Sequence, residues 1–573
     1  MAQSAKTMAE PTYSQFACIG GGFSGIGLGA TLQRWYGITD VRIFERDEFY
    51  GGTWWANSYP GAACDIPSAL YSLSYEPNPD WTVLCPPRNE LLQYIIRVVK
   101  KYKLEDRISL NTRVDRCEWR EESRRWRITV CNLKTGETSL HECQFLFTCA
   151  GGLATPQDLD IPGAESFKGP IFHTARWRKD VDLTDKNVIV IGNGATGNQL
   201  VPAILPQTKH LTHLVRSQHW ILRPIQSALS PLMRISLKYI PGVMILQRLL
   251  VFSIAEEGFR GFRVSRDGQR ARNHQRKEAT EYLKETAPAK YHDVLVPDYE
   301  PNCKRRVFDA GYLKCLNEDN ITLTTEKPVE VVPEGIRTEK GLIEADVIVL
   351  ANGFKTGDPF VNIEIVGRHG KTIQEHWASM GGPGAYNCTS VNGFPNFFMI
   401  LGPNTLTGHS SALMASENAI NYAMRLIKPI LDGEATTVDV RREAEARYSR
   451  KVQAALQDTI WLAGGCSNWY TGTFDGKKYN AVSYPWWQPH YWYSCLFPRW
   501  SDFEYTGIGK PRRRHSASRG AKIIAAALVI AGLAYQMKQG KTPTSLRELV
   551  ALCWANLLVS RDLILAHVPA LKG

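Results

Sequence analysis

Two parts of the chain repeat one pattern, in which a short apolar run leads through a glycine-rich turn into a longer amphipathic stretch and then a second apolar run. Apolar runs bounded by glycine are typical of strands in a parallel sheet, and the longer stretches between them favour helices. The pattern predicts strands at 14–19, 41–44, 187–191 and 211–215 and helices at 25–36 and 195–204. We therefore expect an α/β fold with two parallel-sheet domains.

Two further apolar strands, predicted at 145–148 and 347–350, lie on either side of the second repeat, and each runs into a turn of small residues. The economical arrangement is one domain inserted into the other, with these turns as the crossing points. The expected division is a first domain at 1–150 and 351–508, an inserted domain at 151–350 and a tail at 509–573.

A stretch rich in Leu and Ile, 221–259, is interrupted by three prolines and is followed by a charged, helix-like stretch at 269–286. Proline ends or kinks a helix, so several short helices are expected rather than one long one. We expect a helical insertion at about 221–290 within the inserted domain.

The composition is that of a globular protein. At 573 residues the chain exceeds what one hydrophobic core usually organises. With 44% hydrophobic and 22% charged residues it is not mostly disordered, collagen-like or a coiled coil.

The net charge is +12, but nine Lys or Arg and no acid lie between Tyr505 and Arg547, so the rest of the chain is nearly neutral. A nearly neutral body argues against nucleic-acid binding, and the basic tail favours a local anionic partner such as a lipid surface.

The tail combines a basic linker, 511–520, with two uncharged apolar runs at 523–537 and 549–560. Both runs are shorter than the roughly 20 residues that a membrane-spanning helix needs. Two interpretations stay open. The runs pack as helices on the body or on another subunit, or residues 510–573 form a membrane-surface anchor.

The N-terminal residues lack the apolar segment of a secretory signal, which favours a cytoplasmic protein. The 13 cysteines form no CxxC pair and show no metal-ligand spacing with histidine. We therefore expect reduced thiols and no metal site.

The first turn, Gly20-Gly21-Gly22-Phe23-Ser24-Gly25, fits the pattern GxGxxG. Gly20 permits the tight turn, Gly22 lets a pyrophosphate approach the backbone, and Gly25 lets the helix pack closely on the strand. Glu45 follows the second strand, where a carboxylate accepts hydrogen bonds from a ribose diol. This turn predicts a dinucleotide site.

The second turn also fits GxGxxG, with Gly192, Gly194 and Gly197 in the three glycine positions. Here the second strand is followed by Arg216 rather than by an acid, and a cation at this point suits the 2′-phosphate of NADP. The expected NADP-binding residues in and after this turn also include Ala195, Thr196 and Ser217. Two Rossmann-like domains in one chain indicate electron transfer from NADPH to a bound flavin, FAD.

Between the two turns, residues 167–177 fit the pattern FxGxxxHxxxW. Its fixed positions are Phe167, Gly169, His173 and Trp177. The segment resembles the fingerprint of the type I Baeyer–Villiger monooxygenases, a branch of the flavoprotein monooxygenases, although Arg178 stands where that family usually has Pro or Asp. Five more segments are similar to the same family, and to fungal members in secondary metabolism: 51–54, 59–65, 304–313, 351–354 and 466–470.

The resemblance implies FAD and NADPH as cofactors, with O2 and a small-molecule ketone as substrates. The reaction would insert one oxygen atom beside the carbonyl, through a flavin C4a-peroxide, to give an ester or lactone. It implies catalytic roles for Arg305 and Asp65 and a coupling role between domains for His173. It also implies flavin contacts from Thr53, Trp54, Asp65 and Tyr71, and NADP contacts from Lys304 and Trp469. The apolar helical insertion and the many aromatic residues favour a roomy apolar site, and the resemblance to fungal members implies a large lipophilic ketone, such as a polyketide or terpenoid.

Two alternatives remain at this point. The first is oxygenation of a soft nitrogen or sulfur atom, against which the Asp65 and Arg305 pair argues. The second, from another class, is an NADPH-dependent flavin or disulfide reductase. A disulfide reductase would need a redox CxxC or CxxxxC pair beside the flavin, and the sequence has none there.

Overall fold

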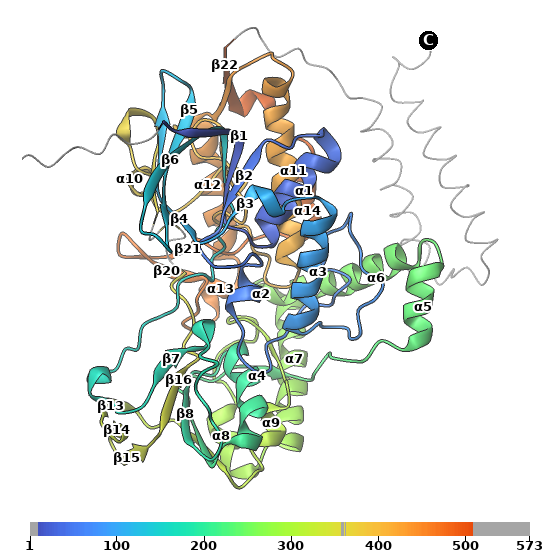
Figure 1. The fold of residues 1–573 in the computed structure, drawn as a ribbon. Coiled ribbons are helices and arrows are strands. Elements are labelled where there is room, and N and C mark those ends of the chain that lie inside the picture. Colours follow the sequence, from blue (N-terminus) through green and yellow to red (C-terminus); the bar gives the residue numbers. More distant parts are fainter. Residues whose placement is uncertain (1–9, 357–359, 361–362, 508–573) are drawn as a thin grey trace, which may run out of the picture. The chain divides into compact units, whose positions relative to one another are not determined.

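The computed structural model describes residues 10–356, 360 and 363–507. The predicted linker and apolar runs of the tail lie outside these residues. The described chain contains two open sheets, and it passes from the first to the second and back again (Figure 1). Strands up to residue 148 and two strands between residues 364 and 399 form the first sheet, and five strands between residues 171 and 350 form the second. The predicted α/β fold with one Rossmann-like domain inserted into another is confirmed.

The first sheet has eight strands in the order β17-β4-β5-β6-β1-β2-β3, with β18 also paired to β6. They are β1 (Thr12–Ile19), β2 (Val41–Phe44), β3 (Ile108–Ser109), β4 (Thr112–Arg120), β5 (Arg125–Asn132), β6 (Thr138–Thr148), β17 (Glu364–Val366) and β18 (Phe397–Met399). Because β1 is parallel to both β2 and β6, the carboxyl ends of these strands meet at one edge. The first glycine turn lies at that edge.

Helices α1 (Phe23–Tyr36), α3 (Arg88–Lys101), α11 (Ala412–Leu431) and α14 (Gln488–Leu496) belong to one face of this sheet. Their apolar residues and those of β1 and β6 form one buried core, in which Leu28, Ile95 and Ile420 are almost completely buried. The predicted start of the first helix was two residues late, and the helix ends at Gly37, whose left-handed backbone closes it.

The second sheet is entirely parallel, in the order β12-β9-β8-β16-β7. Its strands are β7 (Ile171–His173), β8 (Asn187–Ile191), β9 (His210–Leu214), β12 (Ile321–Thr324) and β16 (Val347–Leu350). Helices α4 (Ala195–Ile204) and α9 (Tyr312–Cys315) share a core with one face. The antiparallel strands β13 (Pro328–Val332), β14 (Gly335–Thr338) and β15 (Gly341–Glu344) pack against the other face.

The predicted helical insertion contains α5 (Pro231–Tyr239), α6 (Val243–Glu257) and α7 (Arg266–Thr286). The chain bends by 114° between α5 and α6, at Pro241 and Gly242, because proline ends the first helix and Gly242 has a left-handed backbone. In Figure 1, α5 and α6 extend away from both sheets. No single helix in the described ranges is long and apolar enough to cross a membrane, although this bent pair passes the same test of length and composition together.

The remaining elements are shorter or lie at the margins of the two sheets. They are α2 (Thr53–Ala56), α8 (His292–Leu295), α10 (Ile373–Met380), α12 (Arg442–Gln457), α13 (Ile460–Ala463), β10 (Ile221–Leu222), β11 (Val307–Phe308), β19 (Thr437–Val440), β20 (Thr471–Phe474), β21 (Lys477–Asn480) and β22 (Phe503–Thr506).

Candidate functional site

The first glycine turn leaves space only at its middle glycine. Gly20 has φ +106°, and a Cβ there would lie 2.6 Å from the carbonyl oxygen of Cys149. A Cβ on Gly25 would overlap the carbonyl oxygen of Gly20. At Gly22, however, the nearest atom would be the Cα of Gly52 at 3.5 Å. The protein itself therefore requires glycine at the first and third positions but not at the second.

The second glycine turn repeats this geometry. Gly192 has φ +112°, and a Cβ there would overlap the carbonyl oxygen of Ala351. A Cβ on Gly197 would overlap the carbonyl oxygen of Gly192. Gly194 has nothing within 4 Å of the same point. In both turns the open position is the one at which a pyrophosphate would approach the backbone.

Both helix N-termini are also free of side-chain caps. Gly22 precedes α1 and Gly194 precedes α4; neither helix has an acid in its first turn. Their first N–H groups and the positive end of each helix dipole thus face the open space. In the second turn, Oδ1 of Asn193 is buried without a hydrogen-bond partner among the described residues. These features fit the pyrophosphates of FAD and NADP.

Glu45 lies directly after β2 and is 6% exposed. Its carboxylate accepts hydrogen bonds from the backbone N–H of Gly21 (2.7 Å) and of Asp47 (3.0 Å). Burial raises the pKa of this carboxyl above its usual range, and the two N–H groups oppose that rise. The carboxylate is thus fixed beside the first turn.

Arg216 and Ser217 follow β9, and Arg216 is exposed. Lys304 lies close by, with its Nζ 4.7 Å from the centre of the Tyr299 ring and a hydrogen bond to the carbonyl oxygen of Gln218 (3.4 Å). Burial and then the positive charge of Arg216 lower the pKa of Lys304. The structure thus brings together the two cations that the sequence assigns to the 2′-phosphate of NADP.

Asp65 and Arg305 form an ion pair between the two domains. The Nε of Arg305 donates to Oδ2 of Asp65 (3.0 Å), and its Nη2 donates to both carboxylate oxygens (2.6 Å each). The charge of Asp65 raises the pKa of Arg305, so the guanidinium stays charged at every working pH. The side chain of Arg305 is 37% exposed and that of Asp65 is 22% exposed, which leaves the pair accessible to a ligand.

Aromatic side chains lie near this pair. Trp54, in the short helix α2, donates from its indole N–H to the hydroxyl of Tyr71 (3.2 Å), while Thr53 beside it is exposed. Tyr71 also makes an edge-to-face contact with Phe23 at the start of α1. Tyr470 is buried against Arg305, and its ring is tilted by 32° from that of Trp469, with 4.3 Å between the ring centroids. The sequence did not single out Tyr470, although it adjoins Trp469 in a quoted segment.

One expectation about the cysteines was wrong. Cys303 and Cys466 form a disulfide bond across 163 residues. The bond joins the segment of Arg305 to the segment of Trp469. A count of cysteines could not show this pair, since only the fold brings the two segments together. The described cysteines other than these two are free, and no described group of His, Cys, Asp and Glu could hold a metal ion.

The fingerprint segment, residues 167–177, contains β7 and is hydrogen-bonded to the turn at 351–354. His173 is 7% exposed; its Nε2 bonds to the carbonyl oxygen of Gly353 (3.0 Å), and its Nδ1 accepts from the N–H of Ala175 (3.0 Å). Burial lowers the pKa of His173, which favours the neutral ring. A Cβ at Gly169 would overlap the carbonyl oxygen of Asp346, and Phe167 and Trp177 pack at opposite faces of the second sheet. This geometry agrees with a coupling role for His173.

A second connection between the domains was not predicted. Gln199 of α4 accepts from the hydroxyl of Tyr59 (2.9 Å) and donates to the carbonyl oxygen of Ala63 (3.0 Å). Burial raises the pKa of Tyr59 to about 12, so its hydroxyl remains a donor. The pattern of a glycine turn gives no signal for this glutamine, because its partner lies more than 130 residues earlier.

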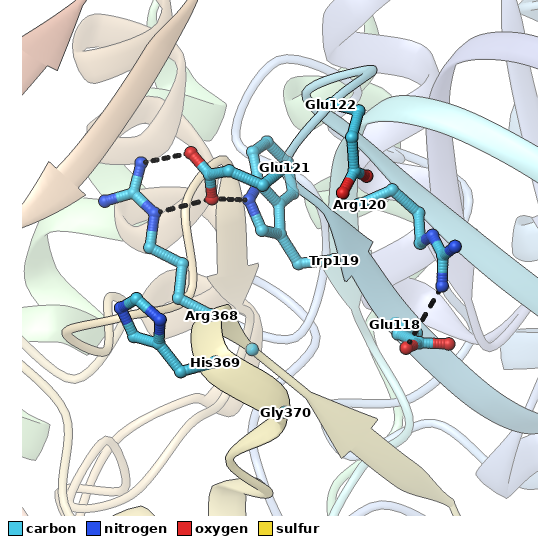
Figure 2. Close-up of a pocket in the computed structure, with 9 residues that line it drawn as sticks. Glu118, Trp119, Arg120, Glu121, Glu122, Arg368, His369 and Gly370 are labelled. Carbon is cyan, nitrogen blue, oxygen red and sulfur yellow. Dashed lines mark hydrogen bonds and ion pairs between the residues drawn. The ribbon is translucent and has the colours of Figure 1, made fainter.

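Figure 2 shows a hollow of about 580 Å³ that lies elsewhere, between the end of β4 and residues 367–370. Four of its charged lining residues form ion pairs, Arg368 with Glu121 and Arg120 with Glu118. None of the residues of the two glycine turns lines it. It is a polar surface hollow and not the site of the chemistry.

Comparisons with known proteins agree with this geometry. Residues 77–374 match the family model described as "Flavin-binding monooxygenase-like". A Baeyer–Villiger monooxygenase of Pseudomonas aeruginosa is 34% identical over 480 residues, which cover 84% of this chain and 89% of that protein. The chain belongs to the Baeyer–Villiger monooxygenases within the flavin-binding monooxygenase-like family. The FAD-binding monooxygenase ktnD of Aspergillus niger is 30% identical over 509 residues, or 87% of this chain and 83% of that protein.

The fold of this Baeyer–Villiger family member matches a solved relative closely. Cyclohexanone monooxygenase from Rhodococcus sp. Phi1, bound to NADP⁺, superimposes with a TM-score of 0.76 at 25% identity, covering 87% of this chain and 100% of that chain. FAD and NADPH, predicted from the two glycine turns, are the cofactors of the family. The chain is thus an FAD-dependent, NADPH-using monooxygenase, and the alternative of a reductase is not supported.

Proposed function

We propose that the protein inserts one oxygen atom of O2 beside the carbonyl of a large lipophilic ketone, giving an ester or lactone. The observation that carries this proposal is the ion pair of Asp65 and Arg305, which joins the two nucleotide domains and remains partly exposed. A permanent cation suits negative charge that develops on oxygen during the reaction. Oxygenation of nitrogen or sulfur does not place such charge on a carbonyl oxygen.

When bound, FAD would activate O2 after NADPH has supplied a hydride. Arg305 would stabilise the negative charge that develops on the carbonyl oxygen of the ketone. The bonds to Asp65 use Nε and Nη2 of Arg305, and Tyr470 also lies against this guanidinium. Asp65 would orient the plane of the guanidinium, and Trp54, Tyr71 and Trp469 would help exclude water.

In the cofactor sites, the N-terminus of α1 and Glu45 would hold the pyrophosphate and ribose of FAD. The N-terminus of α4 would hold the pyrophosphate of NADPH, and Arg216, Ser217 and Lys304 its 2′-phosphate. The uncapped helices and the unfilled positions at Gly22 and Gly194 support these assignments.

The test is the variant Arg305→Ala. It should still oxidise NADPH, but ester formation should fall at least 100-fold, with hydrogen peroxide released instead. Product analysis by mass spectrometry and a peroxide assay measure both. Arg223→Ala removes an exposed arginine that pairs with Glu285 and should leave ester formation unchanged. Normal ester formation by Arg305→Ala would refute the role of Arg305.

For the substrate, we propose a polyketide or terpenoid ketone of secondary metabolism. The aromatic side chains beside Arg305 and the apolar helical insertion support a lipophilic molecule. A panel of bulky and small ketones, amines and thioethers, incubated with NADPH and O2, tests this directly. Ester products from bulky ketones are expected. Products only from amines or thioethers would contradict both the substrate and the reaction.

The cellular setting stays a proposal as well: a cytoplasmic enzyme whose residues 510–573 contact a membrane surface or pack on the body or on another subunit. The basic composition of the linker supports an anionic contact. Fractionation of cells that express the full chain would separate a membrane-bound from a freely dissolved enzyme.

A further inference from the structure

The side chain of Gln199, in α4, binds the segment that leads to Asp65. Its Oε1 accepts from the hydroxyl of Tyr59 (2.9 Å) and from the backbone N–H of Ala63 (3.4 Å), and its Nε2 donates to the carbonyl oxygen of Ala63 (3.0 Å). The amide thus uses its acceptor and one of its donors on the two backbone groups of a single residue. Because Ala63 lies two residues before Asp65, these bonds fix the backbone that carries the carboxylate.

The same segment lies directly against the backbone of α4. Gly61 has φ +81°, and a Cβ there would lie 2.4 Å from the carbonyl oxygen of Gln199 and 3.1 Å from the Cβ of Ala203. Glycine is therefore required at this point of contact. Thr196, in the second glycine turn, also lies against the hydroxyl of Tyr59. The contact thus begins at the end of α4 where the pyrophosphate of NADP would bind.

The residue before Gln199 holds the other half of the ion pair. Asn198 is 1% exposed, and its Oδ1 accepts from the backbone N–H of Ala310 (2.9 Å), five residues after Arg305. Successive side chains of a helix project about 100° apart, so the two amides reach different segments. Two neighbouring residues of one helix therefore bond to both segments from which the ion pair is built.

The ion pair depends on how firmly the two domains are held together, because Asp65 comes from the first domain and Arg305 from the inserted one. The bonds between them measure 2.6–3.0 Å, and a shift of about 1 Å between reacting groups is enough to cost about 100-fold in rate. Water and salt weaken a partly exposed ion pair. The bond from Tyr59 to Gln199 joins neutral groups, and Tyr59 is buried, so this bond is less sensitive to both.

We propose that Gln199 is a positioning residue, which holds Asp65 in register with Arg305 and with NADP bound at the N-terminus of α4. It acts through the backbone of residues 59–65 and not by contact with the substrate. Its effect on oxygen transfer rests on the proposed function of the ion pair. Without the amide, NADPH oxidation continues but fewer turnovers reach the ketone. In each failed turnover, NADPH, one proton and O2 give NADP⁺ and hydrogen peroxide.

The first test compares Gln199→Ala with Gln207→Ala, which changes an exposed glutamine just beyond the same helix. In Gln199→Ala the ratio of ester to hydrogen peroxide should fall at least about tenfold, while kcat and KM for NADPH oxidation change by less than about threefold. Gln207→Ala should match the wild type. A wild-type ratio in Gln199→Ala would overturn the proposal. So would an equal loss of NADPH oxidation and ester, because a general structural defect lowers both.

The second test asks whether Gln199 acts through Tyr59. Tyr59→Phe removes the hydroxyl that bonds to Gln199 and keeps the ring. It should lower the same ratio about threefold or more, and the double variant should be no worse than Gln199→Ala alone. Effects that multiply in the double variant would mean that the two residues act independently, which would overturn the proposal.

The third test does not use the ketone reaction, so it separates this inference from the proposed function. Hydrogen–deuterium exchange is followed in the peptide that contains residues 59–65 of the FAD-loaded protein, without NADP⁺ and with saturating NADP⁺. The ligand should slow exchange at least about threefold in the wild type and in Gln207→Ala but not in Gln199→Ala. Equal slowing in all three proteins would overturn the proposal. A wild type that shows this slowing but makes no ester would refute the proposed function and still support the role of Gln199.

Discussion

The two glycine turns have the same backbone geometry and differ in the residues that follow the next strand. The N–H of Gly20 bonds to the carbonyl oxygen of Phe44 (2.8 Å), and that of Gly192 bonds to the carbonyl oxygen of Leu214 (3.1 Å). Through these equivalent bonds, Glu45 of the first domain corresponds to Val215 of the second. The shared geometry serves the pyrophosphate, which both dinucleotides have. The residue after the strand distinguishes between them.

The same correspondence between the two domains shows that Arg216 is not the residue equivalent to Glu45. Arg216, which the sequence analysis contrasted with Glu45, has its own counterpart in Arg46. Arg46 donates to the carbonyl oxygen of Ala154 (2.8 Å), whereas Arg216 is exposed beside Lys304. We propose that selectivity for NADPH combines two changes: an acid is missing at position 215, and the arginine that follows is available to a ligand.

The largest effect is expected from filling the open position of each turn. In Gly22→Val the side chain would occupy the space in front of α1, so the protein should purify with less than about a tenth of the wild-type flavin. Gly194→Val should stay yellow but lose at least about 100-fold in kcat/KM for NADPH. Visible absorbance and steady-state rates measure both. If either variant lost both cofactors, the two turns would not act separately.

A smaller effect is expected from the cation of the second domain. Arg216→Ala should lower kcat/KM for NADPH by about 10- to 100-fold, because charge-assisted hydrogen bonds to phosphate are lost. The rate with NADH should change little. Adding Val215→Glu should shift the preference further toward NADH. Arg46→Ala is the control, since it alters the equivalent arginine of the other domain, and an equal loss of NADPH preference there would contradict the assignment.

Glu45→Gln tests the acid of the first domain. The amide keeps one acceptor oxygen for the N–H of Gly21 but removes the charge, so FAD should dissociate about tenfold more readily. Fluorescence of released FAD on dilution measures this. The KM for NADPH should not move. Flavin retention equal to wild type would show that the carboxylate only supports the turn.

The smallest effect concerns pH and only the second turn. His213 of β9 is buried, lies 2.9 Å from the carbonyl oxygen of Gly192 through Nε2, and contacts the hydroxyl of Tyr312 through Nδ1. Its counterpart in the first domain, Ile43, does not titrate. Burial lowers the pKa of His213 to about 4. Between about pH 6.5 and 4 the unfolded chain binds a proton here that the native chain does not. Acidification therefore lowers the free energy of unfolding, by at most about 3 kcal/mol.

The measurement is the midpoint temperature of thermal unfolding, determined at several pH values from 7 to 5 for the wild type and for His213→Gln. The wild-type midpoint should fall more steeply. Because His141 and His219 remain in both proteins, the difference isolates His213. Parallel curves would mean that His213 contributes nothing to this dependence.

The sequence predicted the elements that local patterns encode. The bounds of α4, β2, β8 and β16 agree residue for residue, because each follows from an apolar run with a glycine or polar boundary. Contacts between segments that lie far apart in the sequence could not be predicted in this way. Gln199 with Tyr59 and Cys303 with Cys466 depend on how the two domains pack, and no local pattern carries that information. Asp65 with Arg305 was predicted only through the family resemblance.

The disulfide has a further consequence for the denatured chain. By joining Cys303 to Cys466 it turns 163 residues into a closed ring that persists when every other contact is lost. A ring of that size samples far fewer conformations than an open chain, and the chain-entropy relation gives a destabilisation of the denatured ensemble of about 5 kcal/mol. A reducing agent would thus make the enzyme easier to unfold without removing any packing contact of the native state. Once formed, the same covalent ring keeps the segments that carry Arg305 and Trp469 together in the denatured chain, so that on refolding the two halves of the site do not have to find each other by diffusion.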